Sequence, residues 1–76
     1  MTFEELLTRR MRDYGMSLME LSAEIGRSHD YMSSMLKRGG INVKPQTRRE
    51  ICRVLDIDPE VLDASILESM RARWGQ

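Results

Sequence analysis

The sequence predicts an all-α fold, and three kinds of local signal support this prediction. Apolar side chains recur three or four positions apart along most of the 76 residues, which is the spacing that places them on one face of a helix. Serine or threonine followed three positions later by glutamate opens two segments, at Thr2 and at Ser17, and such a pair caps a first helical turn. Glycine or proline marks several other segment boundaries. We therefore expect one compact five-helix domain over residues 1–76, in which residues 63–76 are a helical extension.

The first helix is predicted between Thr2 and Gly15. Thr2 and Glu5 form its capping box, and Gly15 supplies the residue at which the helix ends. This helix is expected to pack on the two that follow it. Its apolar stripe comprises Phe3, Leu6, Leu7, Met11 and Tyr14.

Two short helices are predicted within residues 17–37, joined by a tight turn at Gly26. Ser17 and Glu20 cap the first of them, and Gly26 ends it in a left-handed conformation. Ser28 is expected to cap the second helix. The buried stripes of the two helices comprise Leu18, Leu21, Ile25, Met32, Met35 and Leu36.

The outer face of the second of these helices carries short polar side chains. At about 100° per residue they lie opposite the apolar stripe, and they lack the i,i+4 charge pairs of a helix that is merely solvated. A helix of this width fits the major groove of DNA, where such side chains can meet base edges. The outer-face residues are His29, Asp30, Ser33, Ser34 and Lys37.

The fourth helix is expected to begin near Pro45, because proline suits a first helical turn. Thr47 and Glu50 would form a third capping box there. Residues 38–44, which include two glycines, form the preceding loop. Ile41 or Val43 anchors this loop on the core.

The fifth helix is expected to begin at Pro59, after a cap at Asp58, and to run toward Trp74. Its second half, residues 66–74, has little left to cover within one molecule, and an exposed apolar patch of this kind usually marks an interface. We therefore expect a two-fold homodimer through this helix; the alternative is a helix folded back over its own core. The interface residues are Ile66, Leu67, Met70 and Trp74.

A longer pattern spans residues 17–62. It comprises Leu21, Ser22, Ile25, Gly26, Met32 and Met35, followed by Pro45, Thr47, Ile51, Leu55, Ile57, Val61 and Leu62. This pattern resembles the helix-turn-helix domain of the lambda-repressor/Cro (XRE-type) family. The resemblance covers most of the chain and implies a lambda-repressor-like DNA-binding domain whose second and third helices are the helix-turn-helix. Family members often have an Arg and Glu ion pair at the positions of Met11 and Leu36, where both residues are apolar here.

The net charge of the chain is zero, but the charge is unevenly distributed. Residues 31–55 carry six Lys and Arg against one Glu, whereas residues 56–76 carry five Asp and Glu against two Arg. Local potential steers binding more than total charge does. The basic segment is therefore a candidate for contact with a nucleic-acid backbone.

The resemblance and the polar outer face together imply two sets of DNA contacts. The residues expected to meet base edges are Ser28, His29, Asp30, Ser33, Ser34 and Lys37. Those expected to meet phosphates are Arg10, Arg27, Arg38, Lys44, Thr47, Arg48 and Arg49. Asp30 has two interpretations: it accepts a hydrogen bond from cytosine N4, or it only favours the positive end of its helix.

The function that the resemblance implies is a sequence-specific transcriptional regulator. It would act as a repressor or autoregulator that binds a palindromic operator in double-stranded DNA as a dimer, through the major groove. A phage Cro-like protein and a restriction–modification controller fit equally well. An alternative from another class is an antitoxin or other protein-binding module that acts through the acidic, apolar C-terminal helix. A third is a helix-turn-helix scaffold that has lost DNA binding, which Asp30 and the zero net charge motivate.

Other functions have little support in the sequence. His29 and Cys52 are the only histidine and cysteine, and a metal site needs three or four ligands. No nucleophile with a base can be assembled, so we expect no metal, no cofactor and no enzyme activity. No apolar run approaches the roughly 20 residues of a membrane span, and we find no secretion leader. With a single cysteine, these features favour a cytoplasmic protein.

Overall fold

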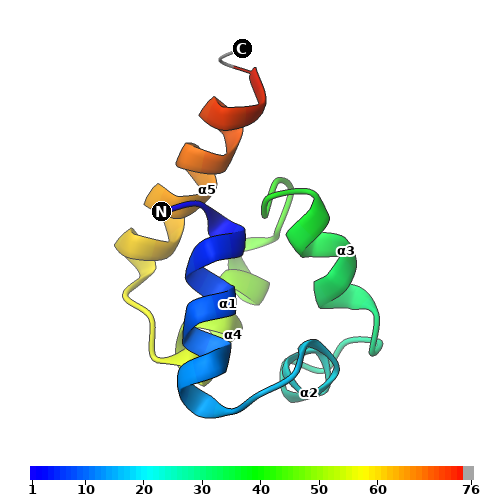
Figure 1. Cartoon of the computed structure of the whole chain (residues 1–76). Coiled ribbons are helices and arrows are strands. Elements are labelled where there is room, and N and C mark those ends of the chain that lie inside the picture. The colour runs from blue at the N-terminus through cyan, green and yellow to red at the C-terminus, as the bar shows by residue number, and fades with distance from the viewer. Residues whose placement is uncertain (75–76) are drawn as a thin grey trace.

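A computed structural model describes residues 1–74, which form five α-helices and no strand (Figure 1). The helices are α1 (Phe3–Tyr14), α2 (Leu18–Glu24), α3 (Tyr31–Lys37), α4 (Pro45–Leu55) and α5 (Pro59–Trp74). The predicted all-α class and the number and order of the helices are confirmed. The end of the predicted extension, residues 75 and 76, lies outside the described residues.

Both N-terminal capping boxes predicted from the sequence are present. Before α1, the Glu5 N–H donates to Thr2 Oγ1 at 3.2 Å and the Thr2 N–H donates to Glu5 Oε1 at 2.9 Å. The equivalent bonds before α2 join Ser17 and Glu20 at 3.1 and 3.0 Å. The pKa of both glutamates is lowered, because hydrogen bonds with the cap residue favour the ionised carboxylate. The bond with the backbone N–H of the cap residue has the larger effect, and the bond with its hydroxyl the smaller one.

Glycines end α1 and α2, as predicted. Gly15 and Gly26 adopt left-handed backbone conformations, with φ of +62° and +74°. After Gly15, the Met16 N–H bonds back to the Met11 carbonyl at 2.9 Å, and an equivalent bond of 2.9 Å follows Gly26. This arrangement satisfies carbonyls that the helix itself leaves unpaired.

The start of α3 differs from the prediction that Ser28 caps it. The helix begins at Tyr31, and the Ser28 hydroxyl donates to the Asp30 carboxylate at 3.1 Å instead of accepting a helical N–H. The Ser28 carbonyl accepts the Tyr31 N–H at 3.0 Å. A turn therefore leads into α3, and Asp30 precedes the helix without a capping bond from its side chain.

The start of α4 agrees with Pro45 but lacks the predicted capping box. Lys44 precedes the helix and makes no capping bond with its side chain. Thr47 is the third helical residue, and its side chain faces the interior with 3% exposed. The predicted cap before α5 is present, since the Glu60 N–H donates to Asp58 Oδ1 at 2.9 Å.

The core forms where α1 packs against α5, α4 and α3 (Figure 1). Tyr14 is the member of the predicted α1 stripe that does not join it: its side chain is 49% exposed, and the Arg10 guanidinium lies 5.7 Å from its ring centroid. The largest fully buried side chains are Phe3, Leu7, Leu21, Met32, Ile51, Leu55 and Leu62.

Small residues let the loop after α3 approach α1 and α5 closely. A Cβ atom at Gly40 would lie 2.9 Å from the Phe3 ring. Ser69 of α5 accepts the Phe3 N–H at 2.8 Å through its hydroxyl, which donates to the Ser65 carbonyl at 3.0 Å. Val43 is the predicted anchor that lies in the core, with 7% exposed. These contacts hold the C-terminal end of α3 against the rest of the domain.

Arg10 joins α1 to the end of α4. Its guanidinium donates to the Leu55 carbonyl at 3.0 and 3.2 Å and to the Asp56 carbonyl at 2.9 Å. These carbonyls lie at a helix end, where no further turn of the helix provides donors. We expect Arg10→Ala to lower the free energy of unfolding by about 2 kcal/mol, because it removes a charged donor from the negative end of a helix.

Arg9→Ala is the matched control, since Arg9 is exposed on the same helix and forms none of these bonds. Its cost should stay below about 0.5 kcal/mol. Chemical denaturation of the two variants measures the difference, and equal losses would show that the carbonyl bonds do not stabilise the fold.

Candidate nucleic-acid interface

A buried serine holds α2 and α3 together. Ser22 has no exposed surface, and its hydroxyl donates to the Leu18 carbonyl at 2.9 Å while accepting the Met32 N–H at 3.1 Å. A larger side chain at this point would force the two helices apart. The side chains of Met32 and Met35 on the inner face of α3 are buried in the core.

The opposite face of α3 is exposed to solvent. Within α3 this face carries the hydroxyls of Ser33 and Ser34 and the ammonium group of Lys37, and the turn before α3 adds the hydroxyl, imidazole and carboxylate groups of Ser28, His29 and Asp30. Together these groups provide donors and acceptors of hydrogen bonds. Of the six residues predicted to meet base edges, Ser33 is half-buried. The exposed ones are Ser28, His29, Asp30, Ser34 and Lys37.

Basic side chains continue from the end of α3 to the first turns of α4. Arg38 follows α3, Lys44 precedes α4, and Arg49 lies on the outer side of α4; all three are exposed. With Lys37 they form what we call the basic edge. None of the three ion pairs found among residues 1–74 involves a member of the basic edge. Their charges are therefore available to an external anion.

Arg27 connects the turn before α3 with the start of α4. Its guanidinium donates to Thr47 Oγ1 at 3.0 Å and lies 5.1 Å from the centroid of the Tyr31 ring. Because the Thr47 side chain is 3% exposed and its hydroxyl accepts from Arg27, Thr47 is not available for the predicted phosphate contact.

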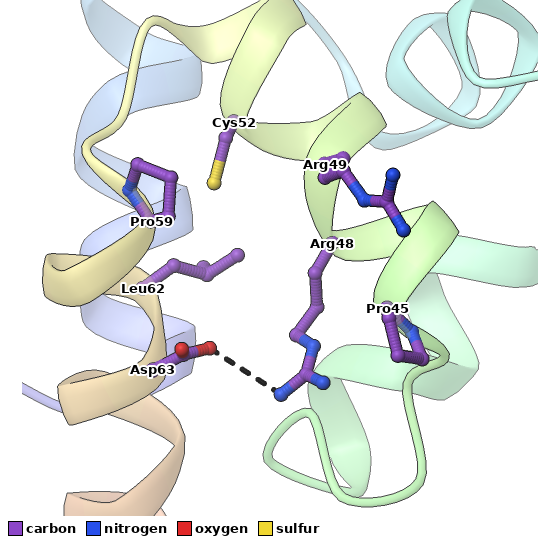
Figure 2. Close-up of a pocket in the computed structure, with 7 residues that line it drawn as sticks. All are labelled: Pro45, Arg48, Arg49, Cys52, Pro59, Leu62 and Asp63. Carbon is purple, nitrogen blue, oxygen red and sulfur yellow. Dashed lines mark hydrogen bonds and ion pairs between the residues drawn. The ribbon is translucent and has the colours of Figure 1, made fainter.

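Two further predicted phosphate contacts already have partners within the protein. Arg10 is not available, because its guanidinium binds the carbonyls at the end of α4. Arg48 pairs with Asp63 of α5, with 3.3 Å between Nη1 and Oδ1 (Figure 2). No sequence pattern predicts either contact, because the partners are 15 or more positions apart along the chain.

The four residues predicted to form a dimer interface on α5 differ in their exposure within the monomer. Ile66 lies in the core of the monomer with 6% exposed, so it is not available to a partner. Met70 is half-buried against the core, whereas Leu67 and Trp74 are 54% and 71% exposed. We refer to Leu67, Met70 and Trp74 as the α5 patch.

A pocket of about 170 Å³ lies between α4 and α5 (Figure 2). Cys52 lies on one wall, and burial raises the pKa of its thiol; Asp63 and Asp58 raise it further, and Arg48 opposes them. The thiol is therefore protonated and weakly nucleophilic at neutral pH. The residues that line the pocket are Pro45, Arg48, Arg49, Cys52, Pro59, Leu62 and Asp63.

Three further findings concern metal binding, membrane-spanning helices and similarity to known proteins. Within residues 1–74, no three His, Cys, Asp or Glu side chains gather closely enough to hold a metal ion. None of the helices α1–α5 combines the length and apolar character that a bilayer crossing requires. Comparison of the chain with protein-family models, curated proteins and solved structures finds no match.

Proposed function

We propose that this protein is a sequence-specific DNA-binding transcriptional regulator of the lambda-repressor/Cro type, in which α2 and α3 are the helix-turn-helix. The observation that carries the proposal is the exposed polar face of α3, which is followed along the chain by the exposed cations of the basic edge, unpaired within residues 1–74. A polar helix face with cations along its flank matches the base edges of a major groove and the phosphates next to them. The concentration of positive charge in residues 31–55 supports the same function despite the zero net charge.

In the proposed complex, α3 enters the major groove, and Arg38, Lys44 and Arg49 of the basic edge contact phosphates, which sets the register of the protein on the duplex. Arg27 is proposed to hold α3 at a fixed angle to α4, because it contacts both Tyr31 and Thr47. Ser33 is half-buried, and its short side chain is proposed to leave room for bases. The side chains proposed to meet base edges are Ser28, His29, Ser34 and Lys37.

Selection from a pool of random-sequence duplexes tests this proposal. We expect the enriched sequences to share a two-fold symmetric motif with half-sites about 34 Å apart, which is one turn of the DNA helix. The absence of enrichment with folded protein would overturn the proposal.

The α5 patch is proposed to join two copies of the chain, so that two α3 helices face one side of the duplex. Leu67→Asp should convert a dimer to a monomer, because a carboxylate would be buried at the centre of the interface. Val61→Asp is the matched control, since Val61 is 49% exposed on the same helix and lies outside the patch. Sedimentation equilibrium of the two variants and the wild type measures the effect.

The same experiment separates the dimer from the alternative function. If the wild type sediments as a monomer at tens of micromolar, the α5 patch does not join two copies. The exposed Leu67 and Trp74 would then favour a protein partner of different sequence, as in an antitoxin.

A further inference from the structure

Arg48 of α4, which is adjacent in sequence to Arg49 of the basic edge, is paired with Asp63 of α5. Arg48 directly precedes Arg49 in α4, yet Figure 2 shows its side chain directed toward Asp63 while Arg49 points away. The side chains of Arg48 and Asp63 are 34% and 58% exposed. Both charges are therefore in contact with solvent, and the Arg48 guanidinium can rotate outward without breaking a buried contact.

We propose that Asp63 competes with the DNA backbone for Arg48 and thereby limits how tightly the protein binds DNA. The proposal rests on the DNA-binding function proposed above. A carboxylate oxygen and a phosphate oxygen offer a guanidinium the same kind of charge-assisted hydrogen bond. While Asp63 holds Arg48, this arginine contributes no net positive charge at the DNA surface.

A purely structural role explains the pair less well. Buried Ile51, Leu55 and Leu62 already join α4 to α5. A single contact of 3.3 Å between two partly exposed side chains adds little to stability. Arg48 can therefore leave Asp63 readily for another anion. The free energy cost of this change rises as the Asp63 carboxylate comes closer to the phosphates, because like charges repel.

Replacement of Asp63 by asparagine should therefore strengthen DNA binding. Asp63→Asn preserves the shape of the side chain and removes its charge, so Arg48 can contact a phosphate without losing an ion pair. We expect about fivefold tighter binding at low salt. The dependence of log affinity on log salt should steepen by roughly one unit, because one more phosphate is neutralised. Selected and scrambled duplexes should gain equally, since phosphate contacts carry no sequence information.

Two control variants separate this mechanism from a general effect of charge. Glu60→Gln removes the same charge from α5, but Glu60 forms none of the ion pairs found among residues 1–74. It should change affinity by less than about twofold. In a protein that also carries Arg48→Ala, Asp63→Asn should give no tighter binding beyond that of the Glu60 control, because the cation for which Asp63 competes is absent.

Cys52 reports on the same ion pair without DNA. The Asp63 carboxylate raises the pKa of the Cys52 thiol, so Asp63→Asn should move the pH dependence of its alkylation by iodoacetamide to lower pH. An unchanged profile would show that Asp63 does not face this pocket and would overturn the proposal.

The binding titration distinguishes the failure of this proposal from the failure of the proposed function. If wild type binds the selected duplex and Asp63→Asn binds no more tightly than Glu60→Gln, the competition proposal alone is overturned. If no variant binds duplex DNA, both proposals are overturned.

Discussion

Gly40→Ala is expected to lower the free energy of unfolding by about 3 kcal/mol, through overpacking against the core and backbone strain. The added Cβ would lie 2.9 Å from the Phe3 ring, which is fully buried. Gly40 also has a φ of +78°, which favours glycine. The loss should be large because the loop, α1 and α5 meet at this point.

Gly26→Ala is the matched control. Its φ of +74° is almost the same, but no atom lies within 4 Å of the added Cβ. Only the backbone strain remains, so we expect a loss of about 1 kcal/mol. Urea denaturation of the two variants separates packing from strain. Equal losses of unfolding free energy would show that the close approach of Gly40 to Phe3 adds no packing cost.

The combined substitution of Lys44→Ala and Arg49→Ala is expected to weaken binding of the selected duplex by about 30-fold at low salt. Both side chains are exposed members of the basic edge, so the substitution removes two phosphate contacts and little packing. The dependence of log affinity on log salt should become shallower by about two units. Fluorescence anisotropy at a series of salt concentrations measures both quantities.

The control for net charge is the combined substitution of Arg9→Ala and Arg53→Ala. It removes the same charge from positions outside the basic edge: Arg9 lies on α1, and Arg53 pairs with Glu50 at 2.7 Å. We expect a loss of less than about threefold. Similar losses for both combinations would mean that DNA responds to overall charge and not to the basic edge.

The sequence predicted the parts of the fold that depend on neighbouring residues. The capping boxes at Thr2 and Ser17, the glycine ends at Gly15 and Gly26, and the start of α5 at Pro59 are all present. Each depends on bonds between residues a few positions apart. Two local predictions fail. The Ser28 hydroxyl had a nearby carboxylate as a competing partner, and Thr47 lies inside α4, where its hydroxyl accepts from Arg27 instead of capping the helix.

The contacts that the sequence did not predict join distant segments. Spacing identifies which face of a helix is apolar, but it does not show which element covers a side chain. The spacing therefore predicts Ile66 in the dimer interface, although the loop at Gly40 covers it in the monomer. Arg10 and Thr47 were assigned to phosphates by resemblance, whereas their partners come from α4 and from the turn before α3.

The measurement that tests the central proposal most directly is a titration of the wild-type protein with its selected duplex and with a scrambled duplex, at two salt concentrations. We expect the selected duplex to bind on the order of 10³-fold more tightly, and both affinities to fall steeply as salt rises. Equal and weak binding of the two duplexes would contradict sequence-specific recognition by α3.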